Sequence, residues 1–177
     1  EYAVVLERTC FYPEGGGQPG DQGFLEWKDR RTGEKKIAVL DTTEKDGEIL
    51  HHTREAVEPG TEVTGKIDWE RRFELMQNHT GEHIVSGLIY ARFGYHNVGF
   101  HMGSDVLTVD LDGAFSQEQM RELEREANLA VWKYLPVDVR VYSHEEVGKL
   151  EYRSKKEIPG PVRIVTIPGT DVCACCG

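Results

Sequence analysis

The sequence predicts an α+β fold in which an N-terminal, glycine-rich antiparallel β-barrel is followed by an α/β subdomain. Two observations support this class. Before position 68, short β-branched runs are separated by Gly, Pro and Asp turns, a pattern typical of antiparallel strands. After Trp69, the spacing of apolar residues changes to a helical period. We therefore expect two regions, residues 1–68 and residues 69–177.

The barrel is expected from four strand-like runs in the first region. They are "YAVVLERT", "KIAVLD", "ILHHT" and "TEVTGKID". Between the first two lies "TCFYPEGGGQPGDQG", residues 9–23, a glycine-rich segment that we expect to be a surface loop containing Gly16, Gly17 and Gln18. Glycines let a backbone come close to a ligand, although such segments are also common as simple barrel turns.

The second region begins with "ERRFELMQNHTGEHIVSGLIYARF", which we expect to be a helix that ends at Gly94. A β segment, "HNVGFHMGSDVLTVDLD", follows it. Ser116, with Gln119 three residues later, predicts a capping box that starts a second helix, and Pro136 ends that helix. The last elements are expected to be a strand at "VDVRVYS", a short helix at "HEEVGKL" and a strand at "VRIVTI".

The composition of the chain is that of a globular protein. Its 177 residues are 38% hydrophobic, which is enough for a buried core. Apolar runs extend over only a few residues, so we expect no membrane span. No charged-then-apolar leader opens the sequence, which favours a cytoplasmic location. The sequence gives no prediction of oligomeric state.

A candidate metal site lies in "NHTGEH", where His79 and His83 stand four residues apart. On a helix, positions i and i+4 share one face, so both imidazoles can point at one ion. Three cysteines, including Cys175, lie within the last five residues, where adjacent positions make poor disulfide partners. A thiolate from this cluster is a suitable third ligand for zinc.

Two interpretations of the histidine pair compete at this point. As H-x-x-E-H, it matches the helix of inverted zinc peptidases, in which Glu82 would be the general base. That interpretation needs a downstream carboxylate as third ligand, and it leaves the cysteine cluster and the glycine-rich segment without a role. The second interpretation gives a role to the glycine-rich segment, to the histidine pair and to the cysteine cluster together.

Taken together, residues 9–23, the pair His79 and His83, and Cys175 resemble the alanyl-tRNA synthetase editing domain and the AlaX-type trans-editing proteins. That family has a T-x-F-Y-P-x-G-G-G-Q-P stretch, then H-T-x-x-H, then C-x-G-T-H, and the order here is the same. The resemblance implies that His79, His83 and Cys175 are zinc ligands. The family's fourth ligand, a histidine, would fall two places beyond Gly177.

The resemblance implies a zinc-dependent hydrolase that removes serine or glycine from mischarged tRNA(Ala) in trans. Its partner would be the acceptor end of the tRNA. Thr9 and Gln18 correspond to loop residues that approach the aminoacyl group, with Gly16 and Gly17 beside them. In the β segment, His101 is a further candidate for the substrate side. The alternatives are the zinc peptidase and a non-catalytic zinc module that binds tRNA.

Net charge is weak evidence against a nucleic-acid partner. The chain carries a net charge of −10, whereas proteins that neutralise phosphates usually present a basic face. An enzyme that holds only the acceptor end needs fewer basic contacts. Short basic clusters occur at residues 28–31, 35–36, 71–72 and 152–156.

Overall fold

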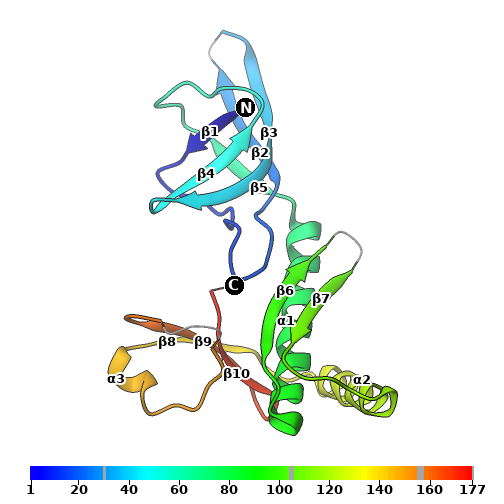
Figure 1. The fold of residues 1–177 in the computed structure, drawn as a ribbon. Coiled ribbons are helices and arrows are strands. Elements are labelled where there is room, and N and C mark those ends of the chain that lie inside the picture. Colours follow the sequence, from blue (N-terminus) through cyan, green and yellow to red (C-terminus); the bar gives the residue numbers. More distant parts are fainter. Residues whose placement is uncertain (30, 104–105, 155–157, 177) are drawn as a thin grey trace. The chain divides into compact units, whose positions relative to one another are not determined.

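The computed structural model describes residues 1–29, 31–103, 106–154 and 158–176, and it divides into two compact units, Glu1–Met76 and Gln77–Gly177. The predicted division at residues 68 and 69 stays a prediction of domain organisation. The elements along the chain (Figure 1) are β1 (Tyr2–Val5), β2 (Gly23–Asp29), β3 (Gly33–Lys45), β4 (Glu48–Thr53), β5 (Thr64–Ile67), α1 (Trp69–Phe93), β6 (Asn97–Met102), β7 (Leu107–Leu111), α2 (Gln117–Trp132), β8 (Asp138–Tyr142), α3 (His144–Val147), β9 (Val162–Ile167) and β10 (Asp171–Ala174).

The first unit is built on one five-stranded antiparallel sheet with the order β1-β4-β3-β2-β5. Its two edge strands are β1 and β5, and the strand pairings of the described residues do not join them. The antiparallel strands are therefore confirmed, but the sheet is open and the predicted barrel is not. A local strand pattern does not determine closure, because closure depends on pairing between the first and last strands.

The core of this unit lies on one face of the sheet. Its fully buried members are Phe11, Leu25, Ile37 and Val39. Leu25 on β2 pairs with Ile37 on β3, so the core crosses neighbouring strands in register. Phe11 belongs to the glycine-rich segment, which is thereby anchored to the sheet by apolar packing as well as by hydrogen bonds.

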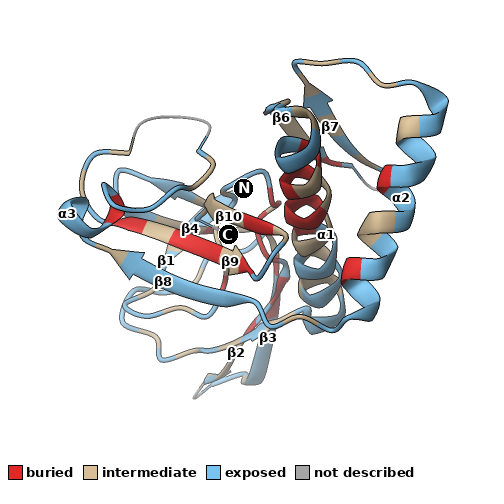
Figure 2. Ribbon diagram, turned by 90° about the horizontal axis from the view of Figure 1, so that it is seen from below, coloured by how far each residue is buried: buried red, intermediate tan, exposed pale blue. Residues whose placement is uncertain are grey.

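The second unit combines α1 and α2 with two further antiparallel sheets, β6-β7 and β10-β9-β8. Ile84 on α1, Ala130 on α2 and Ile167 on β9 form one buried cluster. Figure 2 shows buried residues along α1 and along β9. The mixed α and β character that the sequence predicts is confirmed.

The end of α1 and the start of α2 are as predicted, whereas α2 ends at Trp132, before the predicted stop at Pro136. Gly94 follows α1 with φ +70°, a left-handed conformation that suits glycine after a helix end. Ser116 caps α2, and the reciprocal hydrogen bonds between Ser116 and Gln119 complete the predicted capping box. Neither helix, nor any other in the described ranges, has the length and apolar character needed to cross a membrane.

Candidate metal centre

Helix α1 presents the two histidines one turn apart. His79 and His83 are both buried, and their rings stack with centroids 5.4 Å apart. The Asp68 carboxylate caps the start of this helix, accepting from the Arg71 backbone N–H at 3.1 Å. The expected i, i+4 geometry on one helix face is therefore present.

A glycine lets the third donor reach the helix. At Gly87, a Cβ atom would lie 2.3 Å from the backbone oxygen of Thr170, so any larger residue would push the β9–β10 turn away from α1. With glycine in this position, β10 runs close to the helix and leads into Cys175. The Cys175 Sγ lies 3.3 Å from His79 Nε2. One donor atom from each of His79, His83 and Cys175 lies within 4.8 Å of the other two.

A buried carboxylate supports this centre from behind. His83 Nδ1 donates to Asp171 Oδ2 at 2.8 Å, and Asp171 is itself only 5% exposed. An ionised carboxylate only accepts, so Nδ1 carries a proton, and a metal ion would take the place of the proton on Nε2. Arg153 donates to both Asp171 oxygens, at 2.7 and 2.9 Å. A carboxylate behind a histidine is the usual device that fixes the orientation of a metal-binding imidazole.

The electrostatics of the three donors are strongly coupled. Burial by itself would lower the pKa of His83, but hydrogen bonds to Asp171, Cys173 and Cys175 outweigh it and raise this pKa to about 11. Burial would raise the pKa of Cys175, but hydrogen bonds to His79 and His83 lower it to about 6. The thiol is thus readily ionised among these imidazoles, as a metal-binding cysteine requires.

The donor set of two imidazoles and one thiolate fits zinc, because zinc sites in proteins are built from nitrogen and sulfur donors. His83, Asp171 and Cys173 form an alternative group within the described residues. The Asp171 oxygens are already engaged by His83 and Arg153, so this alternative would have to break a buried ion pair. The group containing His79, His83 and Cys175 is therefore the better candidate for an ion.

The glycine-rich segment of the first unit forms a tight turn. Gly15 and Gln18 exchange backbone hydrogen bonds of 3.1 and 3.0 Å across Gly16 and Gly17. These two central glycines have φ values of +61° and +82°, which side chains rarely tolerate. The sequence predicts Gln18 on the surface, but this residue is only 4% exposed. Gln18 is therefore buried.

Asp21 fixes this turn, and sequence reasoning did not identify it. Its carboxylate accepts from the Tyr12 N–H at 2.8 Å and from Arg72 Nε at 2.7 Å, and Arg72 Nη2 donates to its second oxygen. The Arg72 guanidinium also donates to the Cys10 backbone oxygen at 3.2 Å. In sequence, an Asp between Gly20 and Gln22 suggests only a turn residue.

Thr9 has a structural hydrogen-bond pattern. Its hydroxyl accepts from the Phe11 N–H at 3.0 Å and lies 2.7 Å from His51 Nε2. His51 Nδ1 lies 2.8 Å from the Val4 carbonyl oxygen, which can only accept, so Nδ1 carries the proton and Nε2 accepts from Thr9. The hydroxyl therefore has one acceptor lone pair left for a ligand.

Strand β6 places Phe100, rather than the predicted His101, beside His79. The Phe100 ring lies 5.5 Å from the His79 ring, between centroids. His101 is exposed, and alternate residues of a strand point to opposite faces. Phe100 thus lies beside the candidate centre, although nothing in its apolar side chain indicates this position from the sequence.

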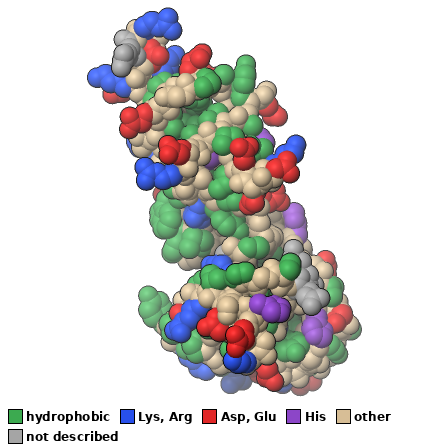
Figure 3. Space-filling model, turned by 90° about the vertical axis from the view of Figure 1, so that its left-hand side faces the viewer, with side chains coloured by type: hydrophobic (Ala, Val, Ile, Leu, Met, Phe, Trp, Pro, Cys, Tyr) green, Lys and Arg blue, Asp and Glu red, His purple; other side chains and the backbone are tan. Residues whose placement is uncertain are grey.

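Several described members of the basic clusters bind other groups of the protein itself. Arg71 donates to the Gly20 backbone oxygen, Arg72 pairs with Asp21, and Lys36 pairs with Glu26 at 3.2 Å. Basic and acidic side chains are interspersed on the face drawn in Figure 3. Part of two clusters, namely Arg30, Lys155 and Lys156, lies outside the described residues.

Comparison with known proteins extends over both units. Residues 1–71 match the profile of the class II tRNA synthetases (A) family. The chain is 34% identical over 180 residues to the alanyl-tRNA editing protein Aarsd1 of Rattus norvegicus, covering 99% of this chain and 42% of that protein. The resemblance to alanyl-tRNA editing proteins is confirmed.

Two further relatives also align along nearly the whole of this chain. Alanyl-tRNA editing protein AlaX-L of Pyrococcus horikoshii is 36% identical over 179 residues, covering 98% of this chain and 43% of the relative. The alanine–tRNA ligase of Methanopyrus kandleri is 38% identical over 183 residues, covering 98% of this chain and 20% of the ligase. The chain spans about two-fifths of the length of the alanyl-tRNA editing proteins that it matches.

Proposed function

We propose that this chain hydrolyses the ester bond of Ser- or Gly-tRNA(Ala) in trans, using Zn²⁺ held by His79, His83 and Cys175. One observation carries the proposal. Three zinc-type donors from segments about a hundred residues apart meet in a chain that aligns along 99% of its length with a protein named for alanyl-tRNA editing. The partner is the acceptor end of a mischarged tRNA.

The residues of the second unit would hold and orient the ion. His79 and His83 would bind through ring nitrogens and Cys175 through its sulfur. Asp171 and Arg153 would keep the His83 ring in the orientation that presents Nε2. Zinc in such a site supplies a Lewis acid that can polarise an ester carbonyl. A half-buried centre beside the Phe100 ring would limit access of bulk water.

Selection of serine is assigned to the glycine-rich segment. A site that hydrogen-bonds a substrate hydroxyl rejects alanine, because its own polar groups would lose their partner. The remaining lone pair of Thr9 would accept from the serine hydroxyl, and Gln18 with the backbone of Gly16 and Gly17 would contact the aminoacyl end. His101 is proposed as a contact on the substrate side.

The peptidase interpretation gains no support from the position of Glu82. Its Oε1 accepts from Ser86 Oγ at 2.6 Å and from Asn97 Nδ2, so the side chain is fixed toward the β6–β7 side of α1. About 100° of helix rotation separates it from His83. A general base must reach the water that attacks near the metal, and this carboxylate is directed elsewhere.

The test is a deacylation assay with Ser-tRNA(Ala), Gly-tRNA(Ala) and Ala-tRNA(Ala), run with and without a chelator, and a peptide-hydrolysis assay on the same preparation. We expect loss of serine or glycine from tRNA, stable Ala-tRNA(Ala), inhibition by the chelator and recovery with Zn²⁺. Metal analysis should show about one zinc per chain. Peptide cleavage without deacylation would contradict the proposal, and stoichiometric zinc with tRNA binding alone would favour the non-catalytic module.

A further inference from the structure

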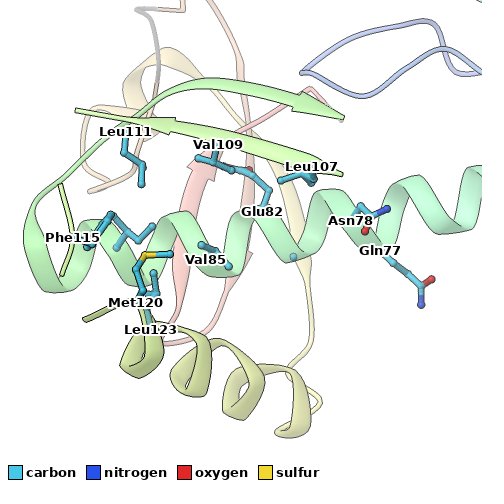
Figure 4. Close-up of a pocket in the computed structure, with 12 residues that line it drawn as sticks. Gln77, Asn78, Glu82, Val85, Leu107, Val109, Leu111, Phe115, Met120 and Leu123 are labelled. Carbon is cyan, nitrogen blue, oxygen red and sulfur yellow. The ribbon is translucent and has the colours of Figure 1, made fainter. Parts of the chain in front are cut away.

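A second candidate site lies on another side of α1. An open cavity of about 440 Å³ is lined by α1, by the β6–β7 hairpin and by α2, all within the second unit. This volume is in the range of about 300–1,000 Å³ that small-molecule sites occupy. Its walls are mainly aliphatic and aromatic, with the side chains of Val85, Leu107, Val109, Leu111, Phe115 and Met120 among them (Figure 4).

Glu82 is the charged residue in the wall of this cavity. It is 7% exposed, and Figure 4 shows it between α1 and the β6–β7 hairpin, near Val109 and Leu107. Ser86 and Asn97 both donate to its Oε1. Within the described part of the chain, Oε2 has no hydrogen bond or ion pair. One carboxylate oxygen thus remains available in a mainly apolar site.

Arg153 is close enough for its charge to interact with Glu82, but it does not form a hydrogen bond with Glu82 Oε2. Burial lowers the pKa of Arg153, but the hydrogen bonds and charge of Asp171 raise it overall, and the charge of Glu82 makes a smaller contribution in the same direction. The side-chain hydrogen bonds of Arg153 nevertheless go to Asp171. The cavity walls contain amides at Gln77 and Asn78 but neither Lys nor Arg. A carboxylate in apolar surroundings is costly unless a donor pairs with it.

We propose that this cavity binds a small ligand with an ammonium head and an apolar body, the ammonium donating to Glu82 Oε2 and the body packing on Val85, Val109 and Leu111. Charge complementarity carries the assignment. A charge-assisted hydrogen bond is about twice as strong as a neutral one, so the carboxylate favours a cationic head over a neutral one of equal size. An anionic ligand would meet repulsion from Glu82.

The first experiment compares n-hexylamine with n-hexanol near pH 7. The amine is then an ammonium ion without a free lone pair, so it is not a metal ligand. Titration calorimetry should give at least about tenfold tighter binding for the amine. Methyl NMR should map both compounds to Val85, Val109 and Leu111. Equal affinities, no saturable binding or shifts mapped elsewhere would overturn the proposal.

Three variants complete the test. Glu82→Gln should abolish the preference for amine over alcohol, whereas Glu124→Gln, which changes an exposed glutamate of α2, should preserve it. Val109→Phe fills the cavity and leaves Glu82 intact, so it should weaken both ligands. If Glu82→Gln does not fold, the amine–alcohol comparison and Val109→Phe still decide the outcome. A preference that survives Glu82→Gln refutes the ammonium site. These measurements involve neither tRNA nor zinc, so they fail independently of the proposed editing activity.

Discussion

In each unit a buried aspartate pairs with an arginine, and the two pairs fix different parts of the protein. In the first unit, Asp21 binds Arg72 and the Tyr12 backbone N–H, so the pair fixes the backbone of the glycine-rich segment. In the second unit, Asp171 binds Arg153 and the His83 ring, so the pair fixes one side chain. An Asp–Arg ion pair therefore fixes the conformation of a loop in one region and the orientation of the His83 ring in the other.

The buried histidines His83 and His51 also differ between the two regions, because the pKa of His83 is raised and that of His51 is lowered. His83 faces a carboxylate, which outweighs burial and raises its pKa to about 11. His51 faces the Val4 carbonyl oxygen and the Thr9 hydroxyl, both neutral, and burial lowers its pKa. A charged partner makes a histidine part of an ionic centre, and neutral partners make it a structural connector. The predictions below test that contrast.

The largest effect is expected from removing a metal donor. His83→Ala should reduce zinc to well below one per chain and bring Ser-tRNA(Ala) deacylation to background, because two donors are too few for a zinc site. Metal analysis and the deacylation assay check both effects. His144→Ala, which changes an exposed histidine of α3, is the matched control and should retain both properties. Full activity of metal-free His83→Ala would contradict the zinc mechanism.

The second effect concerns the pair of the first unit. Asp21→Asn removes the charge opposite Arg72 and should lower the free energy of unfolding by about 3 kcal/mol, the lower end for a broken buried pair. Zinc content should stay unchanged, since Asp21 supports backbone only. Urea unfolding with metal analysis measures this. Glu26→Gln disrupts ion pairs that are more open to solvent, so its cost should be clearly smaller. Equal losses in both variants would show that Asp21 has no special role.

The third effect concerns the pair of the second unit. Asp171→Asn should weaken zinc binding by about 10–100-fold, the usual consequence of losing a carboxylate behind a metal-binding histidine. Competition with a chromophoric chelator gives this ratio. Asp112→Asn is a matched control, since Asp112 accepts from the exposed His96 ring at 3.0 Å. If both variants keep the parent affinity, Asp171 does not orient His83.

Local patterns in the sequence predicted the helices and the residues of the candidate metal group. The helical period and Gly94 indicated α1, and Ser116 with Gln119 indicated the start of α2. The histidine spacing and the cysteine cluster pointed to the group that converges in the second unit. Each of these signals extends over a few residues or rests on the chemistry of the side chain, so it can be recognised without the fold.

Long-range contacts were not predictable in this way. Asp21 and Arg72 are 51 positions apart, and each has an ordinary local explanation, as a turn residue and a polar helix residue. Arg153 lies in a basic cluster that suggests a solvated surface, yet it is the half-buried partner of the buried Asp171. The openness of the first sheet is likewise decided by its edge strands. Only the folded chain shows which of these charges are paired.

The smallest effect should come from His51, and its direction follows from the lowered pKa. Because the folded state favours neutral His51, the stabilisation is fully present above the ordinary pKa of 6.5 and is lost as the pH falls through the lower folded value. Between the folded value and 6.5, the unfolded chain binds up to one more proton than the folded chain. The free energy of unfolding should therefore fall as the pH is lowered from about 7.5 to about 5, through this residue among others.

His51→Gln isolates that contribution, because every other titrating group is common to the parent and the variant. Gln can still donate to the Val4 oxygen and accept from Thr9, but it does not titrate. Urea unfolding at several pH values should give a shallower acid decline for the variant, with the two curves converging as the pH falls. Parallel curves would mean that His51 has the same proton affinity in both states, and the proposed contrast with His83 would then be wrong.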